Sequence, residues 1–206
     1  MVTRPDVTGS GTTWRLAPGR ALLIPLAFAV GAAAPALIPA FRAHAVLLPT
    51  FLGAGGALLA WTVWLYMDAR SEGRTLQLQI LLKKPHWVQT GAQTALLLYW
   101  GWHVPPVFAN LPFLFGQLLF AYGLDALLQW TRRGTYQLGF GPIPIILSIN
   151  FFLWFKPEWY YWQFVIIALG YAAKEFIQWE KQGRRAHIFN PSSFPLAVFS
   201  LVLIVT

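Results

Sequence analysis

The sequence contains no cysteine among its 206 residues. This absence excludes disulfide bonds, thiolate-held iron–sulfur clusters, c-type haem attachment and cysteine-based zinc sites. Charge is also scarce: only 11% of the residues are Asp, Glu, Lys or Arg, against roughly a quarter in a soluble domain. With 57% hydrophobic residues, the chain cannot bury its apolar surface in one globular core. We therefore expect an integral membrane protein in contact with the lipid bilayer.

Other signals are missing as well. The sequence has no Gly-rich phosphate loop, no GxSxG and no HExxH, so no self-contained soluble-enzyme motif is present. Residues 1–20 do not resemble a cleavable signal peptide, and we expect a loose, polar, cytoplasmic tail there. The formal charge of +8 does not indicate nucleic-acid binding, because the basic residues lie in short loops where membrane topology explains them.

Long apolar segments make up most of the rest. They predict an all-α, polytopic membrane protein in which residues 21–206 form a single transmembrane helical domain of about seven segments. The last segment holds only about 15 residues, too few to cross a bilayer. We expect either a fragment of a longer protein or a half-span. The segments are roughly 21–41, 45–67, 88–109, 113–131, 138–155, 159–178 and 192–206.

The basic residues alternate between the two sides of these segments. All of the 15 Lys and Arg residues except Arg42 and Lys156 fall in the N-terminal tail, in the turns after segments two and four, or in the end of segment six and the turn after it. Because cytoplasmic loops are enriched in Lys and Arg, this distribution places the N-terminus and the turn after segment six in the cytoplasm.

Two segments have unusual sequences. Residues 73–86 combine polar flanks with an apolar centre and predict a short interfacial helix that ends before Pro85. Segment five begins with Pro142 and Pro144, which suit only the first turn of a helix. About 13 residues then remain, which is short of a bilayer crossing. A broken helix that faces protein or a cavity is one prediction, and an unbroken span that starts before the prolines is the alternative.

Several polar residues lie in or beside the segments. Asp125 lies well inside segment four, where a carboxylate indicates either function or a structural hydrogen bond. Ser148 and Asn150 lie in segment five, and Lys174 and Gln178 share a helix face that we assign to the membrane interface. The four histidines lie near segment ends, where an interfacial role is more common than metal binding. None lies mid-membrane, so we expect no haem.

The turn before the last segment contains more polar and charged side chains than a turn requires. It reads Arg184-Arg185-Ala186-His187-Ile188-Phe189-Asn190-Pro191-Ser192-Ser193-Phe194. Asn190 and Pro191 suit the N-cap and first turn of the following helix. The apolar residues of this turn predict that it packs against the cytoplasmic ends of segments three and five.

Three stretches together resemble the RnfD/NqrB family of membrane subunits of ion-translocating oxidoreductases. The first is Lys84-Pro85-His86-Trp87-Val88-Gln89 entering an apolar helix, and the second is Phe140 to Ser148 opening a short helix. The third and most specific is a basic stretch followed by His187-Ile188-Phe189-Asn190-Pro191 and small polar residues. The resemblance covers about residues 80–206, roughly the front two-thirds of a family member.

This resemblance implies a flavin-carrying, quinone-linked or ion-translocating unit, located in a bacterial inner membrane with other membrane subunits. The family attaches a covalent flavin at a threonine in an SGAT-like motif downstream of the Asn-Pro turn. That motif is absent from this chain. The resemblance therefore implies at most a non-covalent flavin or a quinone, in a pocket bounded by His187, Asn190, Ser192 and Ser193.

Three functions remain open at this point. The first is an electron-transport subunit that binds flavin or quinone. The second is a non-catalytic accessory subunit of a respiratory or photosynthetic complex, which the missing SGAT motif favours. The third is a small-solute channel or transporter, which the irregular fifth segment suggests.

Overall fold

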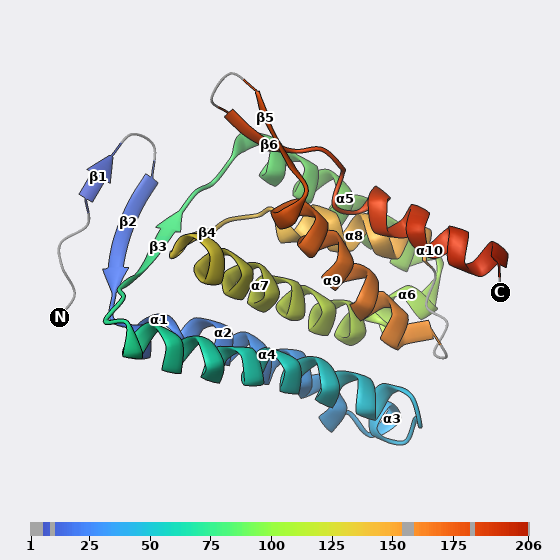
Figure 1. The fold of residues 1–206 in the computed structure, drawn as a ribbon. Helices are drawn as coiled ribbons and strands as arrows, with labels where there is room; N and C mark the ends of the chain where they lie inside the picture. The colour runs from blue at the N-terminus through green and yellow to red at the C-terminus, as the bar shows by residue number, and fades with distance from the viewer. Residues whose placement is uncertain (1–5, 9–10, 154–158, 182–183, 206) are drawn as a thin grey trace.

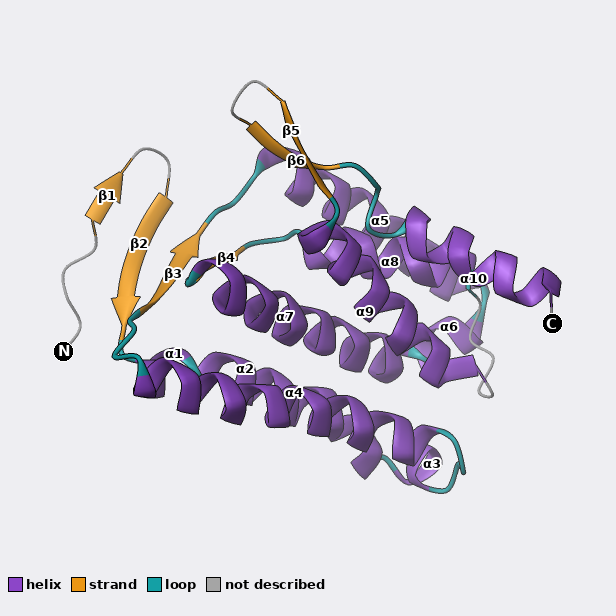
Figure 2. Cartoon of the chain, in the orientation of Figure 1, coloured by secondary structure: helices purple, strands orange, loops and turns teal. Residues whose placement is uncertain are grey.

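The computed structural model describes residues 6–8, 11–153, 159–181 and 184–205, and these are mainly helical (Figures 1 and 2). The mainly helical class is confirmed. In chain order the elements are β1 (Asp6–Thr8), β2 (Gly11–Leu16), α1 (Pro18–Ala21), α2 (Leu23–Ala33), η1 (Ala34–Leu37), α3 (Pro39–Arg42), α4 (Leu47–Ser71), β3 (Leu76–Ile80), α5 (Lys84–His103), α6 (Pro105–Ala109), α7 (Leu111–Arg133), β4 (Thr135–Leu138), α8 (Pro142–Phe152), α9 (Tyr160–Phe176), β5 (Gln178–Lys181), β6 (Arg184–His187) and α10 (Ser193–Val205).

Three helical stretches are long and apolar enough to cross a membrane. They are Pro18–Leu37, which joins α1, α2 and η1, then α4 and α7. The expectation of about seven such segments is not met in the described part of the chain. α8, α9 and α10 have only 11, 17 and 13 residues, and about 20 are needed. α5 has 20 residues, but its polar side chains, among them Gln89 and Gln93, keep it outside the set of apolar spans.

Strands correct the all-α prediction. β1, β2, β3 and β4 form one sheet in that order, and β5 pairs with β6 in a hairpin. Part of the tail that we expected to be loose therefore forms β1 and β2. Residues 76–80 form β3 instead of an interfacial helix, because Leu76, Leu78 and Ile80 alternate with glutamines at the period of a strand.

The sheet is joined to the helices through α7. β3 pairs with β2 in antiparallel and with β4 in parallel orientation. Trp130, near the end of α7, donates from Nε1 to the carbonyl oxygen of Gln77 at 2.7 Å, and its ring meets Tyr136 of β4 edge-on. Gly134 lets the chain turn from α7 into β4, because its φ of 66° lies in the left-handed region. The sheet is thereby fixed to one end of the bundle (Figure 1).

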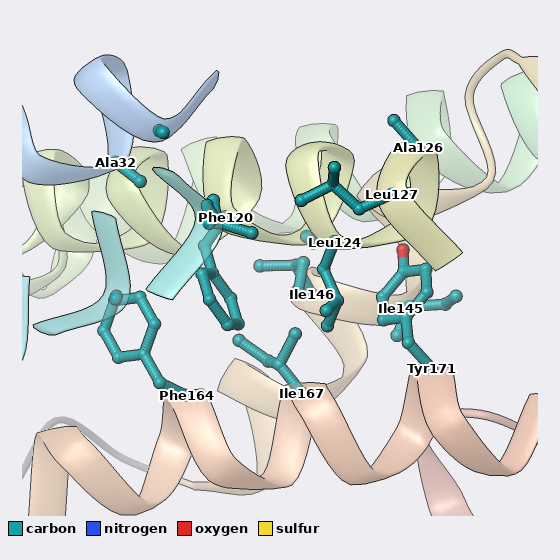
Figure 3. Close-up of a cluster of buried hydrophobic side chains, with 14 of the residues drawn as sticks. Ala32, Phe120, Leu124, Ala126, Leu127, Ile145, Ile146, Phe164, Ile167 and Tyr171 are labelled. Carbon is teal, nitrogen blue, oxygen red and sulfur yellow. The ribbon is translucent and has the colours of Figure 1, made fainter. Parts of the chain in front are cut away.

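The core surrounds α7. This helix contacts α2, α4, α8 and α9, and most of its residues from Phe113 to Trp130 are buried. In Figure 3, Phe164, Ile167 and Tyr171 project from α9 toward α7 and α8. The described core is mainly apolar, and it also holds a few buried polar side chains, among them Gln117, Asp125 and Asn150.

α8 starts at its prolines, as the broken-helix prediction requires. Pro142 occupies the first turn, and the helix ends at Phe152 after 11 residues. It runs beside α5 and against α7. Its first turn lies toward the end of the bundle that carries the sheet, and so does the first turn of α5 (Figure 1).

Candidate functional site

A cavity of about 450 Å³ lies where the starts of α5 and α8, the C-terminal parts of α7 and α9 and the turn before α10 come together. Four helices (α5, α7, α8 and α9), the strands β4 and β5, and the turn before α10 contribute to its wall. The lining residues are Leu81, Lys83, His86, Gln89, Asp125, Gln129, Arg133, Gln137, Gly139, Gly141, Pro142, Pro144, Ile145, Ser148, Lys174, Gln178, Asn190, Pro191 and Ser192. Most of these residues are polar or charged, so the cavity differs sharply from the apolar core beside it.

Three helices begin at this cavity. Lys83 and His86 stand at the start of α5, Pro142 stands at the start of α8, and Asn190 and Ser192 precede α10. The first N–H groups of a helix have no partner within the helix, and the helix dipole places partial positive charge there. The sequence folds this way locally because Pro85, Pro142 and Pro191 each suit the start of a helix.

Asn190 caps α10 as expected. Its Oδ1 accepts a hydrogen bond from the backbone N–H of Ser192 at 2.9 Å and another from the Ser192 hydroxyl at 2.7 Å. Its carbonyl oxygen accepts from the N–H of Phe194 at 3.0 Å. Asn190 and Ser192 both line the cavity. The capping prediction is confirmed, and the cap lies at the cavity wall.

The predictions for the other residues of this turn have mixed outcomes. Ser193 is exposed and is not among the lining residues. The side chain of His187 lies outside the described residues. The expectation that Ile188 and Phe189 pack inward is wrong, because they are 51% and 41% exposed. Phe189 stacks instead on Phe194 at the surface of the turn.

Asp125 forms an ion pair at the cavity wall. Its Oδ1 lies 3.1 Å from Lys174 Nζ, and the Asp125 side chain is only 7% exposed. Lys174 also lies over the ring of Tyr171, at 5.0 Å from its centroid. Lys174 is therefore the counter-ion of a buried carboxylate rather than an interfacial residue. The carboxylate inside an apolar segment was the signal, but the sequence did not indicate its partner.

Neighbouring polar groups on α7 continue along the same wall. Arg133 donates from Nε to Glu175 Oε1 at 2.8 Å, and its Nη2 donates to the other carboxylate oxygen. Gln129 Oε1 accepts from the backbone N–H of Gln137 at 3.1 Å. Sequence reasoning missed Gln129, although Asp125, Gln129 and Arg133 follow the four-residue spacing of one helix face.

The polar residues of α8 face protein, as the broken-helix prediction requires. Ser148 accepts a hydrogen bond from Gln93 Nε2 at 2.9 Å and lines the cavity. Asn150 is 2% exposed, and its Nδ2 donates to Gln117 Oε1 at 2.6 Å. Gln117 in turn donates to Gln163 at 2.5 Å. This prediction is confirmed for both residues.

The histidines are separated from one another in the described chain. His86 lines the cavity, His44 accepts from the N–H of Val46, and His103 meets the ring of Tyr99. Among the described residues, no group of three or more His, Asp or Glu side chains is placed to hold a metal ion.

Tyr136 of β4 lies behind the cavity wall. Burial, and then the charge of Asp125, raise the pKa of its hydroxyl far above the ordinary value of 10.0. The hydroxyl is buried and has no hydrogen-bond partner among the described residues. It stays neutral at any physiological pH, so it adds no charge to this region.

No protein-family model, curated protein or solved structure matches this chain. The site is therefore defined by its own geometry.

Proposed function

We propose that this protein is an integral membrane subunit of an electron-transport complex, and that it binds a non-covalent flavin or a quinone in the cavity. One observation carries the proposal: Asn190 and Ser192 line the same cavity as polar side chains from α5, α7, α8 and α9. These two residues belong to the stretch that most resembles RnfD/NqrB.

The cavity fits such a ligand in size and chemistry. Its volume of about 450 Å³ falls within the usual range of roughly 300–1,000 Å³ for small-molecule sites. Ile145 and the two prolines of α8 offer apolar surface to a ring, while Gln129, Ser148 and Gln89 offer hydrogen bonds to its edges. A bound flavin or quinone would supply the redox chemistry, and the side chains would orient it and restrict water.

The same geometry supports a membrane placement. Pro18–Leu37, α4 and α7 are candidate spans, and the basic turns after α4 and α7 lie at the end that carries the sheet (Figure 1). By the positive-inside rule that end is cytoplasmic, in a bacterial inner membrane under this proposal. The cavity then opens where soluble electron carriers and other subunits of the complex have access.

A second candidate is the non-catalytic accessory subunit. One observation favours it: the two buried acids of the region already have partners, since Asp125 pairs with Lys174 and Glu175 with Arg133. A structural interior that binds nothing also satisfies its charges in this way. In this case the cavity is filled by water alone.

Purification in detergent followed by an absorption spectrum and intact-mass measurement tests the proposal. We expect flavin absorption or an extracted quinone, with no mass added to the denatured chain. If the protein is colourless, titration with free flavin and with a short-chain quinone should still give saturable binding. Absence of bound ligand together with absence of saturable binding favours the accessory subunit.

A matched pair of variants locates the binding. Lys83 and its neighbour Lys84 are both exposed, but only Lys83 lines the cavity. Each of Lys83→Gln and Lys84→Gln removes one positive charge from the start of α5. We expect Lys83→Gln to weaken the binding and Lys84→Gln to leave it unchanged. Equal effects would place the ligand elsewhere.

A further inference from the structure

We propose that α1 and α4 together bind the headgroup of an anionic phospholipid, through Arg20, Arg70 and the hydroxyl group of Tyr66. These three residues lie where two exposed apolar helix faces end in arginine. None of them lines the cavity. The inference therefore goes beyond the proposed function and does not depend on a bound flavin or quinone.

The first apolar face belongs to α4. Leu59, Val63 and Met67 are 45%, 48% and 57% exposed, and Arg70 is exposed as well. The four residues follow one another at spacings of three or four, so they share one face of the helix. Because α4 is a candidate span, this apolar face is suited to contact acyl chains. Arg70 then lies where the hydrocarbon region ends.

The second apolar face belongs to the stretch Pro18–Leu37, which is another candidate span. Leu23 and Val30 are 60% and 65% exposed, and Ala27 between them is exposed too. Arg20, also exposed, lies three residues before Leu23 in the last turn of α1. This face therefore has the same order as that of α4, with an apolar stripe that ends in an arginine.

Tyr66 connects the two ends. α1 and α2 lie beside α4 (Figure 1), and a methyl group added at Gly19 would be 3.9 Å from Tyr66 Cε2. Arg70 donates from Nη1 to the Tyr66 hydroxyl at 3.0 Å, and its guanidinium lies 5.9 Å from the centroid of that ring. Tyr66 thus contacts the residue next to Arg20 and orients Arg70, so both guanidinium groups belong to one small surface.

The positive charge of this surface is not neutralised within the described chain. The acids nearest to Arg70 in the sequence are Asp68 and Glu72, and both pair with Arg74. Each is two residues from Arg70, so neither shares its helix face. Neither Arg20 nor Arg70 forms an ion pair among the described residues. Two guanidinium groups are therefore free to bind an anion, and phosphate oxygens suit their planar array of donors.

The surroundings favour a phospholipid over a soluble anion. Leu23 and Met67, both more than half exposed, lie within one helical turn of the two arginines. A soluble phosphate gains nothing from such apolar surface, whereas a phospholipid joins its phosphate to acyl chains. Trp64, at 48% exposure, adds an aromatic ring of the kind that is enriched at membrane boundaries. Basic residues next to a span attract lipids that carry net negative charge.

Lipid titrations of the full chain in uncharged detergent test the inference. We expect phosphatidylglycerol to raise the thermal unfolding temperature and to remain bound in native mass spectra. Phosphatidylcholine, which has no net charge, should do so much less. Added salt should reduce the difference, since it screens exposed charges. Glycerol 3-phosphate, which has the phosphate without acyl chains, should have little effect.

Four variants locate the lipid. Arg20→Gln and Arg70→Gln should each weaken phosphatidylglycerol binding about fivefold, which is the affinity ratio that corresponds to about 1 kcal/mol for one arginine. Tyr66→Phe should have a smaller effect, because it removes only the hydroxyl that orients Arg70. The control is Arg132→Gln, which removes the same charge from an exposed residue in the last turn of α7. It should leave the binding unchanged.

The opposite results are equally clear. Equal stabilisation by phosphatidylglycerol and phosphatidylcholine would overturn the inference, because net charge would then play no part. Stabilisation by glycerol 3-phosphate as large as that by phosphatidylglycerol would also overturn it, in favour of a soluble anion. An equal loss in Arg132→Gln would show that total charge decides and that no local site exists. Unfolding temperatures without lipid show whether each variant folds, and the single variants suffice if the double Arg20→Gln, Arg70→Gln variant does not.

Discussion

At the scale of single residues, the pair of Asp125 and Lys174 has unequal members. The carboxylate is 7% exposed, whereas the lysine side chain is 26% exposed. A buried charge that loses its partner is strongly destabilising, and a charge that can still reach water is less so. The two residues should therefore respond differently when either is replaced.

We predict that Lys174→Met lowers the free energy of unfolding by about 3 kcal/mol, because it leaves the Asp125 carboxylate buried without a counter-ion. Asp125→Asn should cost less, since water can hydrate the freed lysine. The double variant should recover most of the loss. Chemical unfolding in detergent, followed by tryptophan fluorescence, measures all three. Lys84→Met, at an exposed lysine, is the control. A larger loss from Asp125→Asn would contradict the assignment.

The second residue-scale prediction concerns Asn190. Its Oδ1 accepts from the N–H and the hydroxyl of Ser192, so Asn190→Ala should cost about 1 kcal/mol of stability by loss of the cap. Asn190→Asp keeps the acceptor and should be nearly neutral for stability. If the cavity binds flavin, Asn190→Ala should also weaken that binding. A loss of stability with unchanged binding would make Asn190 a structural cap alone.

At the scale of elements, α10 is held against α9 by close backbone contact. A methyl group added at Gly170 of α9 would overlap the carbonyl oxygen of Pro191. Because that atom belongs to the backbone, no side chain can move aside to make room. Gly170 thus sets the distance between α9 and the first turn of α10, and with it one wall of the cavity.

We predict that Gly170→Ala displaces the start of α10. It should weaken ligand binding clearly and lower the thermal unfolding temperature only slightly. Gly53→Ala in α4 is the matched control, because nothing lies within 4 Å of an added methyl group there. Thermal unfolding and a binding titration of both variants give the comparison. Unchanged binding in Gly170→Ala would show that the cavity does not depend on this contact.

Some structural features were predictable from the sequence and others were not, for physical reasons. The start of α8 and the Asn190 cap were predictable, because proline and N-cap preferences act within a few residues. The pairing of Asp125 with Lys174 joins residues 49 positions apart. It depends on how α9 is rotated against α7, which neither local sequence encodes. β3 was missed because residues 73–86 have apolar and polar content that suits either a short helix or a strand.

At the scale of the whole molecule, the absence of cysteine makes the orientation directly testable. Ala45 lies just before α4 and Ser71 is its last residue, and both are exposed. The helix between them is about 37 Å long at 1.5 Å per residue. We predict that Ser71→Cys is labelled by a membrane-impermeant thiol reagent only from the cytoplasmic side, and Ala45→Cys only from the opposite side.

The unmodified chain, which has no thiol, gives the labelling background. The reverse pattern would contradict this orientation and, with it, the proposed access of cytoplasmic electron carriers to the cavity. Labelling of both positions from one side would show that α4 does not cross the bilayer at all.

The parallel pairing of β3 with β4 also has a consequence for biosynthesis. Residues 77–80 pair with residues 135–138, and α5, α6 and α7 lie between them in the chain. While the ribosome makes those helices, one edge of β3 has no partner, and the last wall of the cavity, at Asn190, is made later still. A ribosome paused before residue 135 would thus leave a nascent chain with an open strand edge, the kind of surface that chaperones and neighbouring chains bind.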